Sequence, residues 1–175
     1  MTGEKSVFRG EAAGKKTLDW GGGTGMSSMD KFADELQEEI MRDVRKRYSN
    51  TVIKHWMNPV NLGRMDDSDG YGRVTGACGD TIEVFIKIDE EGISNAGFFT
   101  DGCGTTIACG SMLVSLAMAK TLRQAARIDK KTILDALGGL PAEDQHCAEL
   151  AANALKYALI DFETGLMREK EGSIS

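Results

Sequence analysis

Three short cysteine motifs, far apart in the sequence, constrain the fold of this chain more than any other feature. Two are loops in which glycines flank a cysteine, Gly-Ala-Cys-Gly-Asp at residues 76–80 and Asp-Gly-Cys-Gly at 101–104, and the third is the dipeptide His146-Cys147. Glycine lets the backbone bend sharply, and thiolates combined with a carboxylate or an imidazole suit soft and borderline metal ions. We therefore expect the fold to bring together five side chains: Cys78, Asp80, Cys103, His146 and Cys147.

Composition argues against several classes of protein. The net charge of −6 gives no basic surface for nucleic acid or for an anionic membrane. No apolar run approaches the roughly 20 residues that span a bilayer, and the N-terminus lacks the apolar core of a secretory signal. The sequence thus predicts a cytoplasmic protein that binds neither nucleic acid nor membrane. In a reducing compartment its four cysteines are expected to be thiols, metal ligands or redox groups rather than disulfides.

Hydrophobic patterning divides the chain into four parts. Residues 1–29 are rich in glycine and show little periodicity, which is typical of a flexible leader. Residues 30–47 are expected to form an amphipathic helical extension, because an apolar side chain recurs at every fourth position and acidic residues precede basic ones. Residues 48–163 contain all three cysteine motifs and are predicted to form the main domain. Residues 164–175 are interpreted as a polar tail.

The main domain is predicted to be α+β, with a small antiparallel sheet packed against several helices. Apolar and more polar residues alternate over residues 81–88, which is the period of a half-buried strand. A turn at 89–92 leads to an expected return strand at 93–100, and residues 72–77 can pair on the other side. The two cysteine loops then lie at the ends of this sheet.

Helices are expected after the second cysteine loop. Thr105 or Thr106 is the predicted N-cap of the first, and Thr121 and Thr132 are the predicted caps of two shorter ones. A final helix is expected to begin near Pro141, which places His146-Cys147 in its opening turns. Because a helix N-terminus favours a thiolate over a thiol, the pattern predicts lowered pKa values for the cysteines in both positions.

Some of these residues also have simpler interpretations. Cys109 and Cys147 both fall on apolar helical stripes, and for Cys109 we expect a place in the core. His55, near a helix end, is expected to be a satisfied or an exposed histidine rather than a ligand. The sequence has no Cys-x-x-Cys pair, so the spacings of zinc fingers, thioredoxin motifs and ferredoxins are poor fits.

Taken together, the motifs resemble those of the IscU/NifU-type iron-sulfur cluster assembly scaffolds. The resemblance begins at Tyr-Ser-Asn-Thr-Val-Ile-Lys-His (48–55) and Asn-Pro-Val-Asn-Leu-Gly (58–63), and continues through both cysteine loops to His146-Cys147. It implies an IscU/SufE-like α+β fold, with the N-terminal helix as an extra element. It also implies that Cys78, Cys103 and Cys147, with Asp80 or His146 completing the set, hold a nascent [2Fe-2S] cluster.

The resemblance further implies a carrier rather than an enzyme. Such a scaffold receives iron and, from a cysteine desulfurase, persulfide sulfur, and later transfers the cluster to acceptor proteins. By similarity, Cys147 is the expected persulfide acceptor and Cys103 its competitor. The alternative is a zinc-bound sulfur-acceptor or relay protein that works with the same desulfurase, since zinc binds a similar donor set and can occupy the apo form.

Three features depart from the family pattern. The family's Leu-Pro-Pro-Val-Lys segment, which a dedicated Hsp70-type chaperone reads in many members, is here Leu-Pro-Ala-Glu-Asp (140–144), so that partner is in doubt. Cys109 stands where many relatives have serine; core, spare ligand and sulfur relay are its three interpretations. The helical extension lies outside the shared region, and docking on the domain or formation of a homodimer are the roles expected of it.

Overall fold

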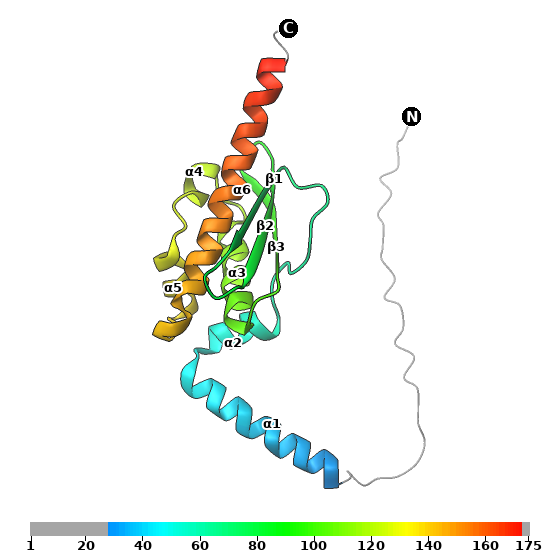
Figure 1. The fold of residues 1–175 in the computed structure, drawn as a ribbon, viewed down its shortest axis with the longest axis vertical. Coiled ribbons are helices and arrows are strands. Elements are labelled where there is room, and N and C mark those ends of the chain that lie inside the picture. Colours follow the sequence, from blue (N-terminus) through cyan, green and yellow to red (C-terminus); the bar gives the residue numbers. More distant parts are fainter. Residues whose placement is uncertain (1–27, 173–175) are drawn as a thin grey trace, which may run out of the picture. The chain divides into compact units, whose positions relative to one another are not determined.

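The computed structural model describes residues 28–172, with side chains described through residue 166. The predicted leader therefore lies almost entirely outside the described residues. A short 3-10 turn, Ala142–Asp144, precedes the last helix. The other elements, in chain order, are α1 (Ser28–Arg47), α2 (Asn50–Met57), β1 (Gly70–Thr75), β2 (Thr81–Ile88), β3 (Ile93–Thr100), α3 (Gly104–Ala117), α4 (Leu122–Ala125), α5 (Lys130–Leu137) and α6 (Gln145–Gly172) (Figure 1).

The chain divides into two compact units, one ending at Gln37 and the other beginning at Glu38. The boundary falls inside α1, which is amphipathic and has no buried residue. In the second unit, Ser49 caps α2, because its side chain accepts a hydrogen bond from the amide of Val52. Within residues 28–172, no helix combines the length and the apolar character that crossing a bilayer requires.

A three-stranded antiparallel sheet of order β1-β2-β3 forms the centre of the second unit. The alternation seen in the sequence is confirmed on one face, where Ile82, Val84 and Ile86 are fully buried. The opposite face is less polar than the pattern indicated: Phe85 is also buried and packs against Tyr71, with 5.3 Å between the ring centroids. The antiparallel sheet and the helices around it confirm the predicted α+β class.

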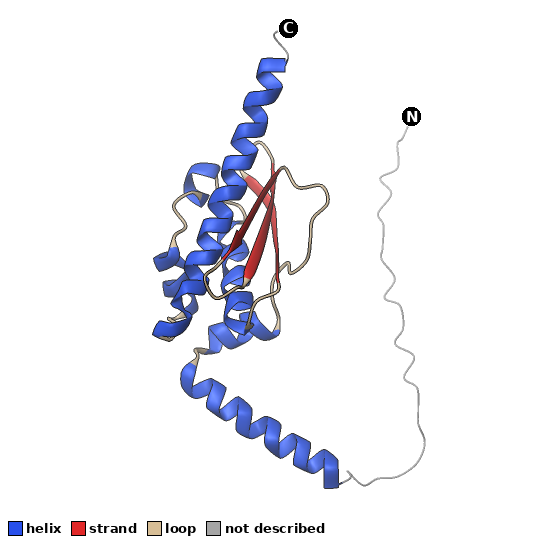
Figure 2. Ribbon diagram, in the orientation of Figure 1, coloured by secondary structure: helices blue, strands red, loops and turns tan. Residues whose placement is uncertain are grey.

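Two helices cover the buried face of the sheet. The long helix α6 packs on β1 and β2, while α3 packs on β3 and against α6 (Figure 2). Strand β1 and α6 touch backbone to backbone at Gly72, where an added Cβ would lie only 2.1 Å from the carbonyl oxygen of Ala154. Helix α6 also bears Cys147, and the loop after β1 bears Cys78 and Asp80. This contact therefore sets the distance between these two cysteine motifs.

The helix ends differ from the sequence predictions in informative ways. Cys103 itself is the N-cap of α3, without a side-chain cap bond, so neither predicted threonine is the cap. Asp129, not Thr132, caps α5, because its carboxylate accepts from the Thr132 amide. The capping box at Thr121 is confirmed. Helix α6 begins at Gln145, after the 3-10 turn, and remains helical through most of the segment interpreted as a polar tail.

The glycine contact between β1 and α6 yields the first prediction. Replacing Gly72 with alanine forces the α6 backbone to move, and we expect the free energy of unfolding to fall by about 3 kcal/mol, at the upper end of overpacking effects. Chemical denaturation measures the change. Gly165→Ala is the matched control, since an added Cβ there meets nothing within 4 Å and alanine favours a helix. Equal stability of the two variants would contradict the contact.

Candidate metal centre

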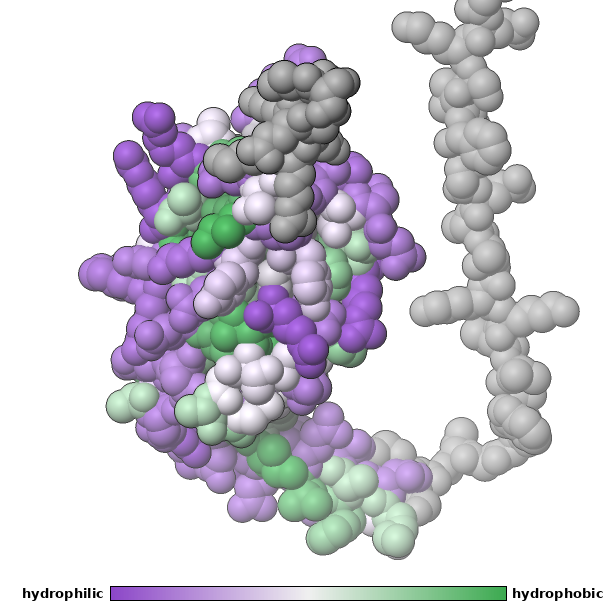
Figure 3. Space-filling view, turned by 45° about the horizontal axis from the view of Figure 1, so that its top comes forward, coloured by the Kyte–Doolittle hydropathy of each residue, from purple (hydrophilic) through white to green (hydrophobic). Residues whose placement is uncertain are grey.

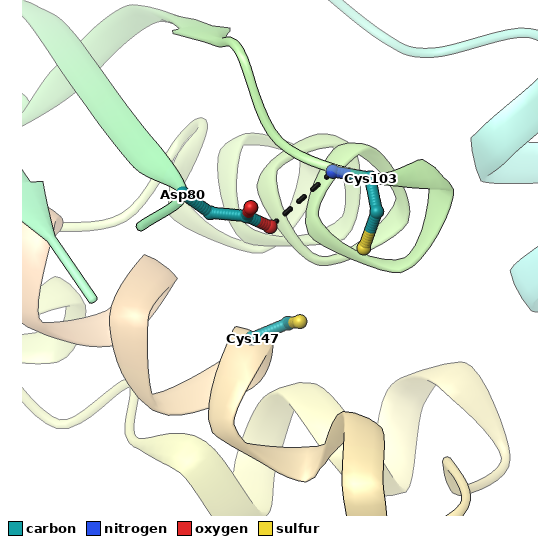
Figure 4. Close-up of side chains that lie close together, drawn as sticks. All are labelled: Asp80, Cys103 and Cys147. Carbon is teal, nitrogen blue, oxygen red and sulfur yellow. Dashed lines mark hydrogen bonds between the residues drawn. The ribbon is translucent and has the colours of Figure 1, made fainter. Parts of the chain in front are cut away.

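Three segments that are remote in sequence meet at one end of the sheet. The β1–β2 loop supplies Asp80, the β3–α3 junction supplies Cys103, and the first turn of α6 supplies Cys147. One oxygen and two sulfur atoms from these residues all lie within 4.8 Å of one another. Figure 4 shows the three side chains directed into a common space. The convergence predicted from the three cysteine motifs is thus present for these residues.

The Asp80 carboxylate is anchored through one of its two oxygens. Its Oδ2 accepts the Thr106 hydroxyl at 2.7 Å and the Cys103 amide at 3.3 Å. Gly102 permits this approach, because a Cβ at that position would come within 2.6 Å of the same oxygen. The Thr106 hydrogen bond is the main cause of a lowered pKa for Asp80; burial opposes the shift, and hydrogen bonds from Cys103 add to it. The carboxylate is therefore ionised at neutral pH.

The two sulfur atoms of the group differ in exposure. Cys103 is exposed and its Sγ lies 2.9 Å from Thr105 Oγ1. Burial alone would raise the pKa of Cys103, but hydrogen bonds from Thr105 and Thr106 outweigh it and lower the pKa. Cys147 is only 1% exposed, and burial raises its pKa. The predicted thiolate is thus favoured at Cys103 and disfavoured at Cys147, because desolvation dominates at the second position.

His146 and Cys78 flank the group without joining it. His146 Nε2 lies 3.6 Å from Cys147 Sγ, and its Nδ1 lies 2.7 Å from the carbonyl oxygen of Glu143. A carbonyl can only accept, so Nδ1 carries the proton and Nε2 keeps a lone pair for a metal ion. Cys78 is exposed in the same loop as Asp80. The structure therefore places these two predicted ligands at the rim of the site.

A pocket of about 550 Å³ adjoins this rim between β1 and α6. It opens beside the β1–β2 loop and brings Cys78 and His146 to a common wall. The remaining lining is largely apolar and consists of Val74, Thr75, Gly76, Ala77, Glu149, Leu150 and Asn153. The pocket leaves room near the site for a segment of another protein or for a small ligand.

Thr105 and Thr106 are the site residues that sequence reasoning missed. Both are buried, and their hydroxyl oxygens lie 3.6 and 3.3 Å from Cys147 Sγ. Their position directly after Cys-Gly is a sequence signal, but the same signal is typical of helix capping. Because Thr106 also holds Asp80, it contacts residues from all three converging segments.

Two other residues have structural roles, as expected. Cys109 is fully buried in the core, and burial strongly raises its pKa, which leaves it a neutral thiol. His55 lies 2.7 Å from the Ser111 hydroxyl, through its Nδ1. Ser111 also accepts the Val60 amide, so this pair fastens α2 and the following loop to α3. Neither residue belongs to the group of converging ligands.

The donor set defines what the site can bind. Two cysteine sulfurs, one ionised carboxylate and a nearby imidazole are ligands for zinc and for iron-sulfur clusters, and they are poor ligands for magnesium or calcium. All four cysteines are free thiols, so none is consumed by a disulfide. The residues present therefore fit a soft or borderline metal centre with sulfur and oxygen or nitrogen ligands.

Comparison with known proteins gives consistent results. Residues 47–169 match the family model described as "NifU-like N terminal domain". The chain is 40% identical over 116 residues to iron-sulfur cluster assembly scaffold protein IscU 1 of Archaeoglobus fulgidus, covering 66% of this chain and 76% of that protein. For the Escherichia coli K12 scaffold protein IscU, the values are 39% identity over 122 residues, 67% and 94%.

A solved structure shares the fold. The N-terminal part of a nitrogen-fixing NifU-like protein from Brucella abortus superposes with a TM-score of 0.53, covering 66% of this chain and 94% of that one. The sequence identity is 16%, so this likeness concerns the fold alone. The resemblance to the IscU/NifU type noted in the sequence is confirmed by these comparisons.

The role of Thr106 yields the second prediction. Loss of a partner that orients a metal ligand typically weakens metal binding by about 10- to 100-fold, so we expect Thr106→Val to weaken Co²⁺ or Zn²⁺ binding by such a factor. Thr106→Ser should retain wild-type affinity because it keeps the hydroxyl. Thr105→Val removes a hydroxyl that contacts both sulfurs but not Asp80, so comparison with it separates the effect on Asp80 from an effect on the sulfurs. Titration of each apo-protein with Co²⁺, followed through the cobalt–thiolate absorption, measures the metal affinity of the wild-type protein and of the three variants. Wild-type affinity in Thr106→Val would overturn the role assigned to Thr106.

Proposed function

This chain belongs to the family of NifU-like N-terminal domains, and from that premise we propose that it is a scaffold for iron-sulfur cluster assembly. Its relatives carry that name, and they indicate a scaffold rather than a catalytic enzyme. In the proposed reaction the chain builds a [2Fe-2S] cluster from iron and from the persulfide sulfur of a cysteine desulfurase. The cluster then leaves for acceptor proteins, so it is cargo rather than a resident cofactor.

One observation carries this proposal: the convergence of Asp80, Cys103 and Cys147 within 4.8 Å at the end of the sheet. Cys78 lies two residues before Asp80 in the same exposed loop, which makes it the third proposed thiolate ligand. Asp80 and His146 are both suited to complete the set, since Asp80 has a second carboxylate oxygen and His146 presents Nε2 toward Cys147 Sγ. A bound cluster would supply iron bridged by sulfide. The chain would supply the ligands, of which Cys147 is buried.

The mixed ligand set also supports a function in release. A carboxylate or imidazole binds iron less firmly than a thiolate does, and its bond to the metal responds to protonation. Asp80 suits that role because Thr106 and Cys103 fix its Oδ2 while Oδ1 remains available. We therefore infer that Asp80 sets the lability of the cluster.

For sulfur delivery we propose Cys147 as the persulfide acceptor, with Cys103 as its competitor. In this step a cysteine sulfur attacks the outer sulfur of the desulfurase persulfide, a new S–S bond forms, and the desulfurase thiolate leaves. The burial of Cys147 requires an opening at the start of α6, whereas Cys103 is exposed. Because the two sulfurs lie within 4.8 Å, sulfur accepted at Cys103 is within reach of Cys147.

The contacts of the segment at residues 140–144 bear on the proposed partners. Leu140 is buried, Glu143 forms an ion pair with Arg47, and Asp144 accepts the Tyr48 hydroxyl at 2.8 Å. Because these side chains already have partners within the chain, the segment is poorly suited to bind an Hsp70-type chaperone. We therefore do not include that chaperone among the proposed partners. A desulfurase and cluster acceptors are the proposed partners, in the reducing cytoplasm, where the cysteines stay reduced.

Zinc binding is the second candidate function. Two thiols, a carboxylate and an imidazole can complete a tetrahedral zinc site, and the near approach of His146 Nε2 to Cys147 Sγ favours it. In this alternative, zinc occupies the site when no cluster is bound. The chain then accepts sulfur from a desulfurase and passes it on without building a cluster.

Chemical reconstitution provides the third prediction. After anaerobic incubation with iron, cysteine and a cysteine desulfurase, we expect near-equal iron and acid-labile sulfide per chain, together with sulfide-to-iron charge-transfer bands. Cys78→Ala, Cys103→Ala and Cys147→Ala should each lose most of the sulfide, because each removes a thiolate ligand. Cys109→Ala is the matched control and should retain it. Tightly bound zinc without labile sulfide would instead favour the relay function.

Cluster lifetime provides the fourth prediction. Asp80→Ala removes the labile oxygen ligand, so we expect a cluster that survives longer and transfers to an apo-ferredoxin more slowly than the wild-type cluster. The decay of the charge-transfer bands after addition of the acceptor measures the transfer half-life. Asp101→Ala, a change in the neighbouring loop outside the ligand group, is the control. An unchanged half-life in Asp80→Ala would count against the role of this carboxylate.

Mass spectrometry of the persulfide provides the fifth prediction. After reaction with a desulfurase and alkylation, we expect the added sulfur on Cys147 in the wild-type protein and in Cys103→Ser, but not in Cys147→Ser. Sulfur on Cys103 in Cys147→Ser, together with no sulfur on Cys147 in the wild-type protein, would assign the acceptor role to Cys103.

A further inference from the structure

A short basic segment stands out in a chain whose net charge is −6. Five of the chain's 21 lysine and arginine residues fall within residues 120–131, where Asp129 is the one acidic residue. Two of these five cations have partners, since Lys130 pairs with Glu149 and Lys131 pairs with Asp135. Among the described residues, no ion pair involves the other three cations, and all three are exposed: Lys120, Arg123 and Arg127. Their positive charge is therefore available to a partner.

These cations border a groove of about 360 Å³, where the end of α3 meets α4 and the start of α5. Lys120 and Arg127 line the groove, and Leu116 and Ile128 give it an apolar lining. The lining is completed by Gln124 and Thr132. Figure 1 shows α4 and α5 on the same flank of α6, and at the left of Figure 3 this flank carries projecting hydrophilic side chains with hydrophobic surface between them. The groove thus combines positive charge with an apolar interior.

The polar groups of the groove are mainly hydrogen-bond donors. Lysine and arginine side chains can only donate. The Oε1 atom of Gln124 accepts the Thr121 amide at 3.1 Å, so its NH₂ group is the part left for a ligand. Thr132 donates its hydroxyl to Asp129, which leaves the hydroxyl oxygen as an acceptor. A ligand that matches these groups brings acceptors, and carboxylates form strong charge-assisted hydrogen bonds with lysine and arginine.

Nucleic acid matches the groove less well than an acidic protein segment does. Nucleic-acid binding relies on many phosphate contacts and, for single strands, on aromatic side chains that stack on the bases. Here three unpaired cations are clustered, and none of the described residues that line the groove is aromatic. An apolar side chain flanked by carboxylates, by contrast, uses both the aliphatic lining and the cations. Charge and shape therefore favour a protein partner.

We propose that this groove docks an acidic segment of a partner protein, in which carboxylates flank a large apolar side chain. The apolar side chain packs on Leu116 and Ile128, and the carboxylates pair with Lys120 and Arg127. The groove lies at the C-terminal end of α3, whereas Cys103 caps the N-terminal end. The two ends are about 20 Å apart at the helical rise per residue. The docking surface is therefore separate from the metal centre, and the proposal is independent of the function proposed above.

Fluorescence anisotropy with a synthetic peptide tests the proposal on the full chain. The probe is fluorescein-labelled Glu-Asp-Leu-Phe-Asp-Glu, and the matched control peptide has serine in place of both leucine and phenylalanine. We expect the probe to bind at least about tenfold more tightly than the serine peptide, because burial of a large apolar side chain favours binding. Its affinity should fall as salt is added, since salt screens the exposed charges. Equal affinity of the two peptides would overturn the proposal, and so would a probe that shows no saturable binding.

Charge reversal locates the contact. Lys120→Glu and Arg127→Glu should each weaken probe binding about tenfold, and the double variant about 100-fold, because each change replaces an attraction with a repulsion. Lys54→Glu is the matched control, since it makes the same change of charge at an exposed lysine of α2 and should leave the affinity unchanged. The reversed peptide Lys-Arg-Leu-Phe-Arg-Lys should bind the double variant about tenfold more tightly than the wild-type chain, which an unfolded variant would not reproduce.

Two results of these titrations would contradict the docking surface. One is an equal affinity of the probe for the wild-type chain and for the double variant. The other is a labelled single-stranded oligothymidine that binds the wild-type chain more tightly than the probe does, because it would identify the basic segment as a nucleic-acid site.

Discussion

The hydrogen bonds to Asp80 are the interaction on which the site depends. The carboxylate stands at the end of the β1–β2 loop, and it binds the amide that opens α3 and the hydroxyl one turn into that helix. The same hydroxyl oxygen lies 3.3 Å from Cys147 on α6. One buried threonine thus connects three segments that are separated by many residues in sequence. The glycines at the contact of β1 with α6 allow this arrangement, because bulkier residues would hold the helix away from the sheet.

Exposure divides the proposed ligands into two kinds. Cys103 and Cys78 face solvent, whereas Cys147 is closed off by the helices around it. In the proposed function, an incoming iron ion or persulfide would meet an exposed thiol first, and the buried thiol lies within 4.8 Å of Cys103. A carrier needs both properties, since an open ligand lets cargo enter and leave and a buried one protects the bond that holds it. The family relationship and the geometry agree on such a carrier.

The sequence predicted those features that local chemistry decides. Alternation over residues 81–88 predicted β2, and three glycine-flanked or helix-opening cysteine motifs predicted a common site. Features that depend on tertiary contacts were missed. Thr106 has the sequence signature of a cap, and only the position of Asp80 gives its hydroxyl another partner. Likewise, the helix N-terminus suggested a thiolate at Cys147, but the depth of burial, which no local pattern encodes, reverses the shift in its pKa.

X-ray absorption at the iron edge of the reconstituted protein would test the central claim most directly. The account places sulfur ligands from cysteines and one lighter ligand, oxygen from Asp80 or nitrogen from His146, around a sulfide-bridged iron pair. It therefore predicts an iron–iron scattering path, mainly sulfur neighbours and a minor oxygen or nitrogen shell. Iron surrounded by oxygen and nitrogen alone, with no iron–iron path, would show that the converging residues do not hold a cluster.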